Sequence, residues 1–139
     1  MNIYVRNHDI DLYKYLNEEQ ILLLNKLVSV KQLKPTEQIR DELEDHLVIP
    51  VNGRLDRIGK GERLLGYVFP GEIDAEAAAF TAQPLPYFLR AVQDCTVNLI
   101  DRHKLQALCE SDPDLKARIQ AAFNDALCLK IVRLTHLEH

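Results

Sequence analysis

A chain of 139 residues with 47% hydrophobic and 27% charged side chains has the composition of one soluble globular domain that can bury a substantial core. Its formal net charge of −4 argues against a protein that attracts nucleic acid or an anionic membrane through its overall field, because such proteins are basic. No apolar run approaches the length of a membrane span. We therefore expect a single domain over residues 1–136, without direct nucleic acid contact or membrane association.

Two helical segments are predicted near the start of the chain. Asn17 is suited to cap a helix while the side chain of Gln20 reaches back, as in a capping box, and apolar residues follow within 21–28. This pattern predicts a short helix packed on the core. Residues 8–16 support one or two further helical turns with Asp9 as their cap. The residues expected on one face of these turns are Leu12, Tyr15 and Leu16.

The middle of the chain changes to the two-residue period of β-strands. Apolar residues alternate from Leu47 to Val51, and the apolar pattern resumes at Leu55 after the dipeptide Asn52-Gly53. Asn-Gly between two such runs predicts a hairpin with a type I′ turn, because both residues tolerate a positive φ. Further strands are expected at residues 28–33, 63–69, 87–92 and 96–101. The centre of the chain is thus predicted to be a compact antiparallel β-unit.

The last third of the chain returns to helical patterns. Asp101 is suited to cap a helix that begins at residue 102, and Ser111 with Pro113 marks the start of a longer one. From Leu115 toward Leu134, apolar residues recur at spacings of three and four, as in an amphipathic helix. The order is therefore helix, β-unit, helix and long helix, which indicates an α+β fold.

The remaining side chains give little sign of catalysis. The three cysteines lack the paired spacing of a zinc site or a disulfide framework, so we expect buried free thiols. No serine stands in a nucleophile motif, and the histidines at 8, 46, 103 and 136 have no metal-binding spacing. We expect no enzyme and no metal, although a bound metal would favour a cupin-type enzyme instead. Without a signal-peptide layout the chain is expected in the cytoplasm, and residues 137–139 look like part of a purification tag.

This order of elements, with several motifs, resembles the cyclic nucleotide-binding domain of the Crp/Fnr type from about Leu16 to Thr135. Residues 16–39 are similar to the family's first helix and strands, with Thr36 where a glycine is usual. Residues 48–58 resemble its LSGRL hairpin, and residues 94–115 resemble its closing strand and helices. The resemblance implies an antiparallel β-roll (a double-stranded β-helix or jelly roll) flanked by N-terminal helices and two C-terminal helices.

Residues 70–92 are similar to the family's phosphate-binding cassette, which is its most specific motif. Gly71 and Glu72 match the segment that leads into the cassette, Ala75 takes the position of a glycine, and Glu76 coincides with the glutamate that holds the ribose hydroxyl. Leu85 stands where the family has the arginine that neutralises the cyclic phosphate. The other residues of this degenerate ligand site are Ala77, Pro86, Tyr87 and Arg90.

The missing arginine weakens the case for tight nucleotide binding. A bidentate arginine contact to a phosphate contributes about 1.5–3 kcal/mol, and an unpaired buried phosphate is costly. Asp74, where the family has an aromatic residue, adds negative charge nearby. Arg90 or backbone N–H groups are the candidates to replace the arginine, whereas Tyr87 and Phe88 are expected to fill the space that the ligand vacates. An open cavity beside Leu85 would contradict this filling.

Two functional hypotheses follow from the resemblance. The first is a regulatory module with no cofactor and at most weak cAMP or cGMP binding, which acts through its C-terminal helix. The alternative is a working sensor for a cyclic nucleotide or another small effector, in a Crp/Fnr-type transcription regulator whose DNA-binding domain is absent from this chain. Because relatives use the equivalent helix to pair subunits, we expect a homodimer. Its contact residues are predicted to be Phe123, Leu127, Ile131 and Leu134.

Overall fold

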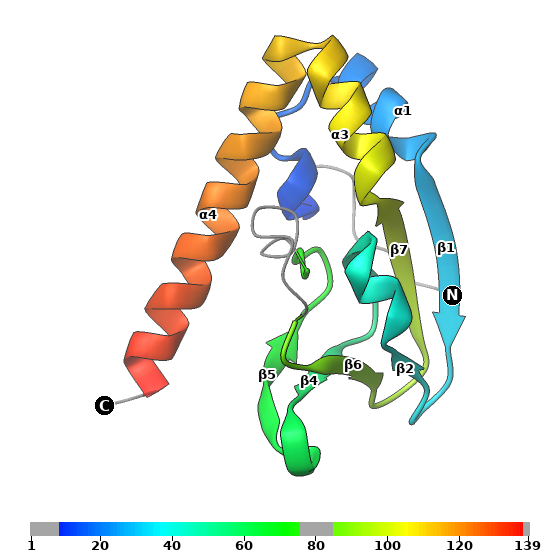
Figure 1. The fold of residues 1–139 in the computed structure, drawn as a ribbon, viewed down its shortest axis with the longest axis vertical. Helices are drawn as coiled ribbons and strands as arrows, with labels where there is room; N and C mark the ends of the chain where they lie inside the picture. The colour runs from blue at the N-terminus through cyan, green and yellow to red at the C-terminus, as the bar shows by residue number, and fades with distance from the viewer. Residues whose placement is uncertain (1–8, 76–84, 138–139) are drawn as a thin grey trace.

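The structure is a computed structural model that describes residues 9–75 and 85–137, the last four of them by their backbone only. Of the predicted site, Glu76 and Ala77 lie outside the described residues, and so does the side chain of Leu134. Figure 1 shows the sheets on one side of the molecule and the long C-terminal helix descending along the other.

The elements follow one another from an N-terminal 3-10 turn to the long last helix. In chain order they are η2 (Asp11–Tyr13), α1 (Glu18–Asn25), β1 (Val28–Leu33), β2 (Gln38–Ile39), η3 (Asp41–Glu44), β3 (His46–Asn52), β4 (Leu55–Ile58), η4 (Lys60–Glu62), β5 (Leu64–Val68), β6 (Phe88–Ala91), β7 (Cys95–Asp101), α3 (Arg102–Ser111) and α4 (Pro113–Leu137).

The strands form two antiparallel sheets. One has the order β1-β7-β3 and the other the order β2-β6-β4-β5. Strand β3 is buried on both faces: Leu47 and Ile49 pack with the helices, whereas Val48 between them packs with residues of the second sheet. Two core clusters result, one under the helices and one between the sheets. The predicted α+β class and antiparallel β-roll are confirmed.

The N-terminal predictions hold in part. Asn17 and Gln20 form the expected capping box, with backbone to side-chain distances of 2.8 and 3.0 Å. The helix ends at Asn25, so the last apolar residues of the predicted run already belong to the connection and to β1. The prediction of Asp9 as a cap is wrong, because η2 follows Ile10 and no side chain caps it. Tyr15 is exposed and does not share the buried face of Leu12 and Leu16.

The predicted Asn52-Gly53 hairpin is wrong. Strand β3 pairs with β7, whereas β4 pairs with β5 and β6, so the dipeptide connects two different sheets. Only Gly53 has a positive φ, of 85°, while a type I′ turn needs two such residues. A Cβ on Gly53 would lie 2.7 Å from the carbonyl oxygen of Asp94, which explains the glycine by close backbone approach.

The C-terminal helices begin close to where they were predicted. Asp101 caps α3 by accepting a 3.0 Å hydrogen bond from the N–H of Lys104, as expected. The cap of α4 is Asp112 and not Ser111, since the Asp112 carboxylate accepts from the N–H of Leu115 at 3.1 Å. The residues of α4 that the core buries are Leu115, Ile119, Ala122, Phe123 and Ala126. All three cysteines are free, but Cys128 is exposed, which corrects the expectation of buried thiols.

Candidate functional site

The segment that leads into the cassette is locked onto the body of the domain. Gly71, at φ 90°, donates its N–H to the carbonyl oxygen of Pro50 at 2.7 Å, and its own carbonyl accepts from the N–H of Asp11 at 2.8 Å. The Glu72 carboxylate accepts from the N–H of Phe69 at 2.8 Å and pairs with Arg133 of α4 at 2.6 Å. This segment therefore contacts both the β-roll and the last helix.

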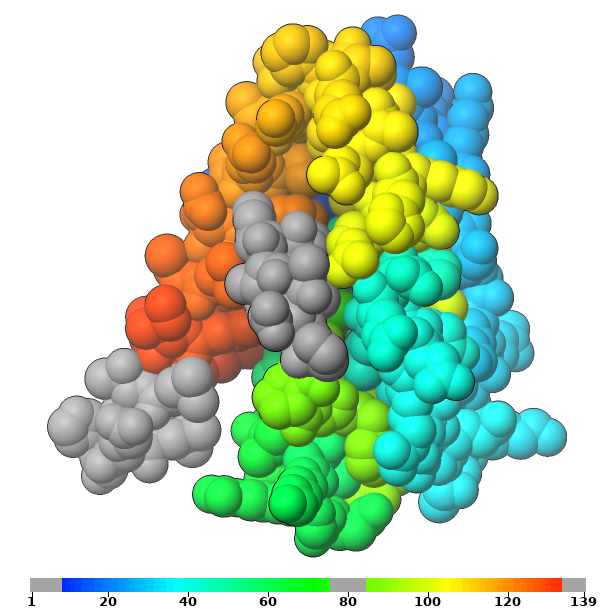
Figure 2. Space-filling model, in the orientation of Figure 1, coloured from blue at the N-terminus to red at the C-terminus, as the bar shows by residue number. Residues whose placement is uncertain are grey.

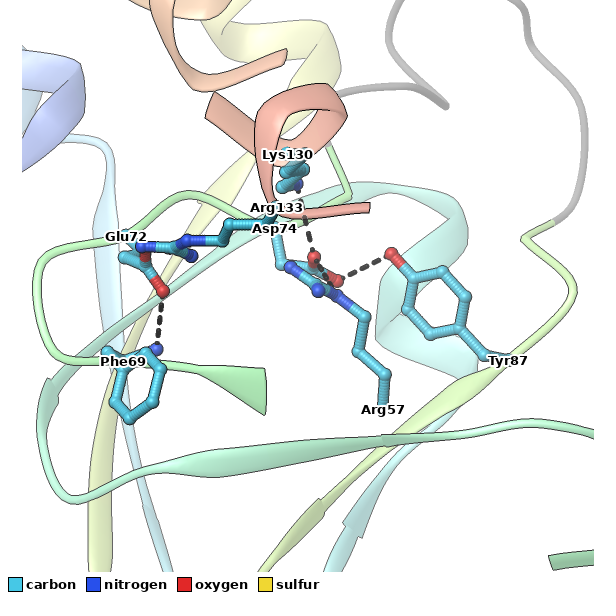
Figure 3. A network of polar contacts seen from close by, with 7 residues as sticks. All are labelled: Arg57, Phe69, Glu72, Asp74, Tyr87, Lys130 and Arg133. Atoms are coloured by element: carbon cyan, nitrogen blue, oxygen red, sulfur yellow. Dashed lines mark hydrogen bonds and ion pairs between the residues drawn. The ribbon is translucent and has the colours of Figure 1, made fainter. Parts of the chain in front are cut away.

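Asp74 is the centre of a buried polar network, shown in Figure 3. Its backbone forms an antiparallel bridge with Val48, with hydrogen bonds of 2.8 and 3.1 Å, which fixes the side chain in place. The carboxylate is fully buried. It accepts hydrogen bonds from Arg57 Nε at 2.9 Å and from the Tyr87 hydroxyl at 2.7 Å, and it pairs with Lys130 Nζ at 3.4 Å.

The network satisfies a carboxylate that would otherwise be costly to bury. Removing an ion from water costs several kcal/mol, and only well-placed partners offset it. Here two cations and a hydroxyl surround one carboxylate. Lys130 comes from α4, as does Arg133, so two ion pairs join this helix to residues 70–74, here called the lead-in segment, at Asp74 and Glu72. The arrangement can hold the second half of α4 against the β-roll.

The predicted phosphate site is apolar where the family has its arginine. Leu85 packs against the core cluster between the sheets. Ala75, in the glycine position, keeps a left-handed φ of 69° and is buried in the same cluster. Pro86 is exposed. Arg90 lies on β6 and pairs with Glu62 at 2.6 Å, apart from the Asp74 network.

A pocket of about 440 Å³ lies beside Leu85, between the β4–β5 turn and residues 85–88. Its presence contradicts the prediction that Tyr87 and Phe88 fill this space. The two rings are directed to different partners, as neighbouring side chains of an extended segment are: Tyr87 binds Asp74, and the Phe88 ring lies under the Arg40 guanidinium at 3.7 Å. The lining residues are Arg40, Ile58, Gly59, Lys60, Gly61, Glu62, Leu85, Pro86, Tyr87 and Phe88.

Sequence reasoning missed Arg57 and Lys130 and gave Asp74 no structural role. A signal for Arg57 was present, because in β4 it lies in phase with Leu55, whose side chain is fully buried between the sheets. A charged residue at an inward position predicts a buried partner, and Asp74 supplies it. Nothing in the sequence indicates that Lys130 reaches the same carboxylate, since 56 positions separate the two residues.

These two sheets, the cassette segment and the C-terminal helices define an α+β domain built on an antiparallel β-roll. The model of the cyclic nucleotide-binding domain family matches residues 37–112, more than half of the chain, and the chain belongs to this family. No curated protein matches the chain significantly. Among the described helices, none combines the length and apolar character needed to cross a membrane. Within the described ranges, no three His, Cys, Asp or Glu side chains are grouped so as to hold a metal ion.

Solved structures of low sequence identity share the fold. A cyclic nucleotide-binding domain from Methylobacillus flagellatus KT is similar with a TM-score of 0.78 and 15% identity, over 94% of this chain and 84% of that one. A protein from Geobacter metallireducens GS-15, provisionally assigned as cyclic nucleotide-binding, has a TM-score of 0.75 and 16% identity. This likeness covers 91% of this chain and 98% of that one. The N-terminal domain of a transcriptional regulator from Streptomyces coelicolor A3(2) has a TM-score of 0.70 and 19% identity, over 86% of this chain and 90% of that one.

Proposed function

We propose that this domain is a regulatory module without catalytic activity that binds cAMP and cGMP weakly or not at all and acts through α4. The observation that carries the proposal is the buried Asp74 carboxylate, which already engages Arg57, Tyr87 and Lys130. A nucleotide phosphate that used these donors would have to displace a carboxylate tethered to the same chain.

Tethering gives Asp74 a large advantage over a free ligand. A group held by a short segment acts at an effective concentration on the order of millimolar or higher, so a micromolar ligand competes poorly for the same cations. The bidentate arginine contact that Leu85 has replaced would add about 1.5–3 kcal/mol, or roughly one to two decades of affinity. Both effects weaken nucleotide binding.

The output through α4 is supported by the change in its contacts along its length. From Leu115 to Ala126 the helix buries apolar residues in the core. Beyond that point, Lys130 and Arg133 pair with Asp74 and Glu72 of the lead-in segment. A ligand or protein that draws either carboxylate away would loosen the second half of α4 while the first half stays packed.

The test is an NMR or calorimetric titration of the domain with cAMP and cGMP up to millimolar concentration. We expect no saturation of the wild-type domain at micromolar nucleotide, and a gain of roughly tenfold or more in Leu85→Arg, because an arginine is restored at the cassette position. Saturable micromolar binding by the wild type would refute the proposal. Leu85→Ala is the matched control, since it changes the same side chain without adding charge.

The second candidate is an effector sensor of a Crp/Fnr-type transcription regulator with a DNA-binding domain outside this chain. It is favoured by the fold, which is shared with the N-terminal domain of a transcriptional regulator. Micromolar nucleotide binding that Arg57→Leu abolishes and Glu37→Leu, a change on the exposed surface, leaves intact would support this candidate.

The domain is also proposed to form a homodimer through the second half of α4. In this half of the helix Leu129 is 42% exposed, Ile131 61% and Val132 51%, and a second helix would cover all three side chains. Phe123, predicted at the contact, belongs to the domain's own core, and Leu127 is half-buried. Analytical ultracentrifugation should show a dimer that Leu129→Glu dissociates and Leu22→Glu, on the exposed face of α1, does not. A monomer at high concentration would refute this proposal.

A further inference from the structure

The pocket between the β4–β5 turn and residues 85–88 has cations that the regulatory proposal does not use. Arg40 lies just after β2 and Lys60 lies in the β4–β5 turn, so neither belongs to the cassette segment. Among the residues that the structure describes, neither side chain has a carboxylate within ion-pairing distance. Figure 2 shows the light-green segment after residue 84 next to the green β4–β5 turn.

The Arg40 guanidinium is oriented before any ligand arrives. Its Nε donates to the Gln38 side-chain oxygen at 2.6 Å, and its Cζ atom lies 3.7 Å from the centroid of the Phe88 ring. These contacts fix the position of the cation without neutralising its charge. A guanidinium held in this way loses less conformational entropy when it binds a carboxylate or a phosphate than a mobile one would.

The acidic residue of the pocket is already neutralised. Glu62 pairs with Arg90 at 2.6 Å, so its charge does not oppose an incoming anion to the same degree as that of an unpaired carboxylate. The turn that presents it contains two successive left-handed residues, Gly61 at φ 71° and Glu62 at φ 62°. Such a conformation is strained for glutamate, and strained residues of this kind concentrate at ligand sites.

The pocket also has apolar side chains and a suitable size. Leu85, Pro86 and Tyr87 contribute apolar surface, and a volume of about 440 Å³ fits a small organic molecule. The geometry points to a binding site for a small organic anion, with an aromatic or aliphatic body against these side chains and its carboxylate or phosphate on Arg40 and Lys60. This inference goes beyond the proposed function, because it assigns a ligand class to a pocket whose cations lie outside the cassette.

The test uses benzoate and phenyl phosphate as probes, with neutral benzamide as their uncharged counterpart. Amide shifts of Gly59 and Gly61 in the intact chain should saturate for one or both anions, with a Kd on the order of 1 mM for a ligand of this size. A preference between the two anions would distinguish carboxylate from phosphate recognition. Benzamide should produce no saturable shift at these glycines. Equal binding of benzamide, or no shift with either anion, would overturn the inference.

Two variants and a control test whether Arg40 and Lys60 bind the anion. Lys60→Glu should weaken the binding of the anion roughly tenfold or more, because an attractive charge becomes a repulsive one. Arg40→Gln should also weaken it roughly tenfold through the loss of a charged bidentate contact. Lys26→Glu, at the C-cap of α1, should leave Kd unchanged, because α1 lies at the opposite end of the molecule from the β4–β5 turn (Figure 1). Unchanged binding in Lys60→Glu and in Arg40→Gln would overturn the assignment.

Failure here is distinguishable from failure of the proposed function. Absence of benzoate and phenyl phosphate binding, together with absence of cAMP binding, would overturn only the pocket assignment. Micromolar cAMP binding that is insensitive to Lys60→Glu would refute the proposed function. The titrations with benzoate and phenyl phosphate would then still decide the pocket assignment.

Discussion

Replacement of Asp74 by alanine is the most direct test of the buried network. The carboxylate is fully buried, and its cationic partners are nearly so, with 16% of the Arg57 side chain and 24% of the Lys130 side chain exposed. Breaking a buried ion pair by removing one partner costs about 3–5 kcal/mol. Since a domain of this size is stable by about 5–15 kcal/mol, Asp74→Ala should remove a large part of its free energy of unfolding.

Asp74→Asn separates charge from shape. The amide fills the same volume and still accepts a hydrogen bond, so the loss should be smaller, about 1.5–3 kcal/mol for charged hydrogen bonds that become neutral. The free energy of unfolding would be measured by urea denaturation monitored by circular dichroism. Glu44→Ala, which removes an exposed carboxylate, is the control and should change the free energy by less than about 0.5 kcal/mol.

Chemical rescue tests whether the cations require an anion. Formate is small enough to enter the space that Asp74→Ala leaves, and it should raise the midpoint of unfolding of this variant more than that of the wild type. Binding to the native state alone contributes RT ln(1 + [L]/Kd), which is about 1.4 kcal/mol at roughly ten times Kd. A loss below about 1 kcal/mol in Asp74→Ala, or equal effects of formate and neutral formamide, would refute the reasoning.

Three further predictions concern the backbone and the surface. Thr36→Gly should stabilise the domain by about 0.5–1 kcal/mol in urea denaturation, because exposed Thr36 has a φ of 76°, and a decrease in stability would contradict this. Gly53→Ala should lower the free energy of unfolding by about 2 kcal/mol or more, since the new methyl group meets the Asp94 carbonyl oxygen at 2.7 Å and φ is 85°; a neutral effect would show that the connection relaxes. The hydrogen bond from Lys31 lowers the pKa of Glu42 below its usual 4.5, so Glu42 contributes stability above pH 4.5 that is lost as the pH falls through its folded-state pKa. Glu42→Gln should therefore cost about 0.5 kcal/mol at pH 7 and almost nothing near pH 2, and an equal cost at both pH values would contradict the assignment.

Local patterns predicted most of the elements because their causes are local. The capping box of Asn17 and the cap at Asp101 need only neighbours three residues away. The choice of strand partners depends on distant residues, which is why the hairpin predicted at Asn52-Gly53 is wrong. The same glycine also suits a connection between strands of two different sheets. Periodicity also predicted the buried stripe of α4. The resemblance assigned Phe123 of this stripe to a dimer contact, whereas it lies in the domain's own core, since a helical pattern does not tell which surface covers a residue.

The resemblance located the cassette, and the sequence showed what it lacks, but not what replaces it. Leu85 marks the missing arginine, and the structure confirms that an apolar side chain packs there. The Asp74 network was not predicted, because it depends on side chains from β4, from the segment before β6 and from α4. Contacts between elements so far apart in the chain follow from the three-dimensional packing and leave no local signature.

The change from apolar to ionic contacts along α4 makes its two halves respond differently to salt. At about 1 M ionic strength the screening length falls to about 3 Å, so the pair of the more exposed Arg133 with Glu72 weakens, whereas the pair of Lys130 with the fully buried Asp74 is screened much less. Burial of Ile119 and Phe123 does not depend on such attraction. Hydrogen exchange in concentrated sodium chloride should therefore speed up over the last turns of α4 alone, dividing one continuous helix into a fixed stem and a releasable arm.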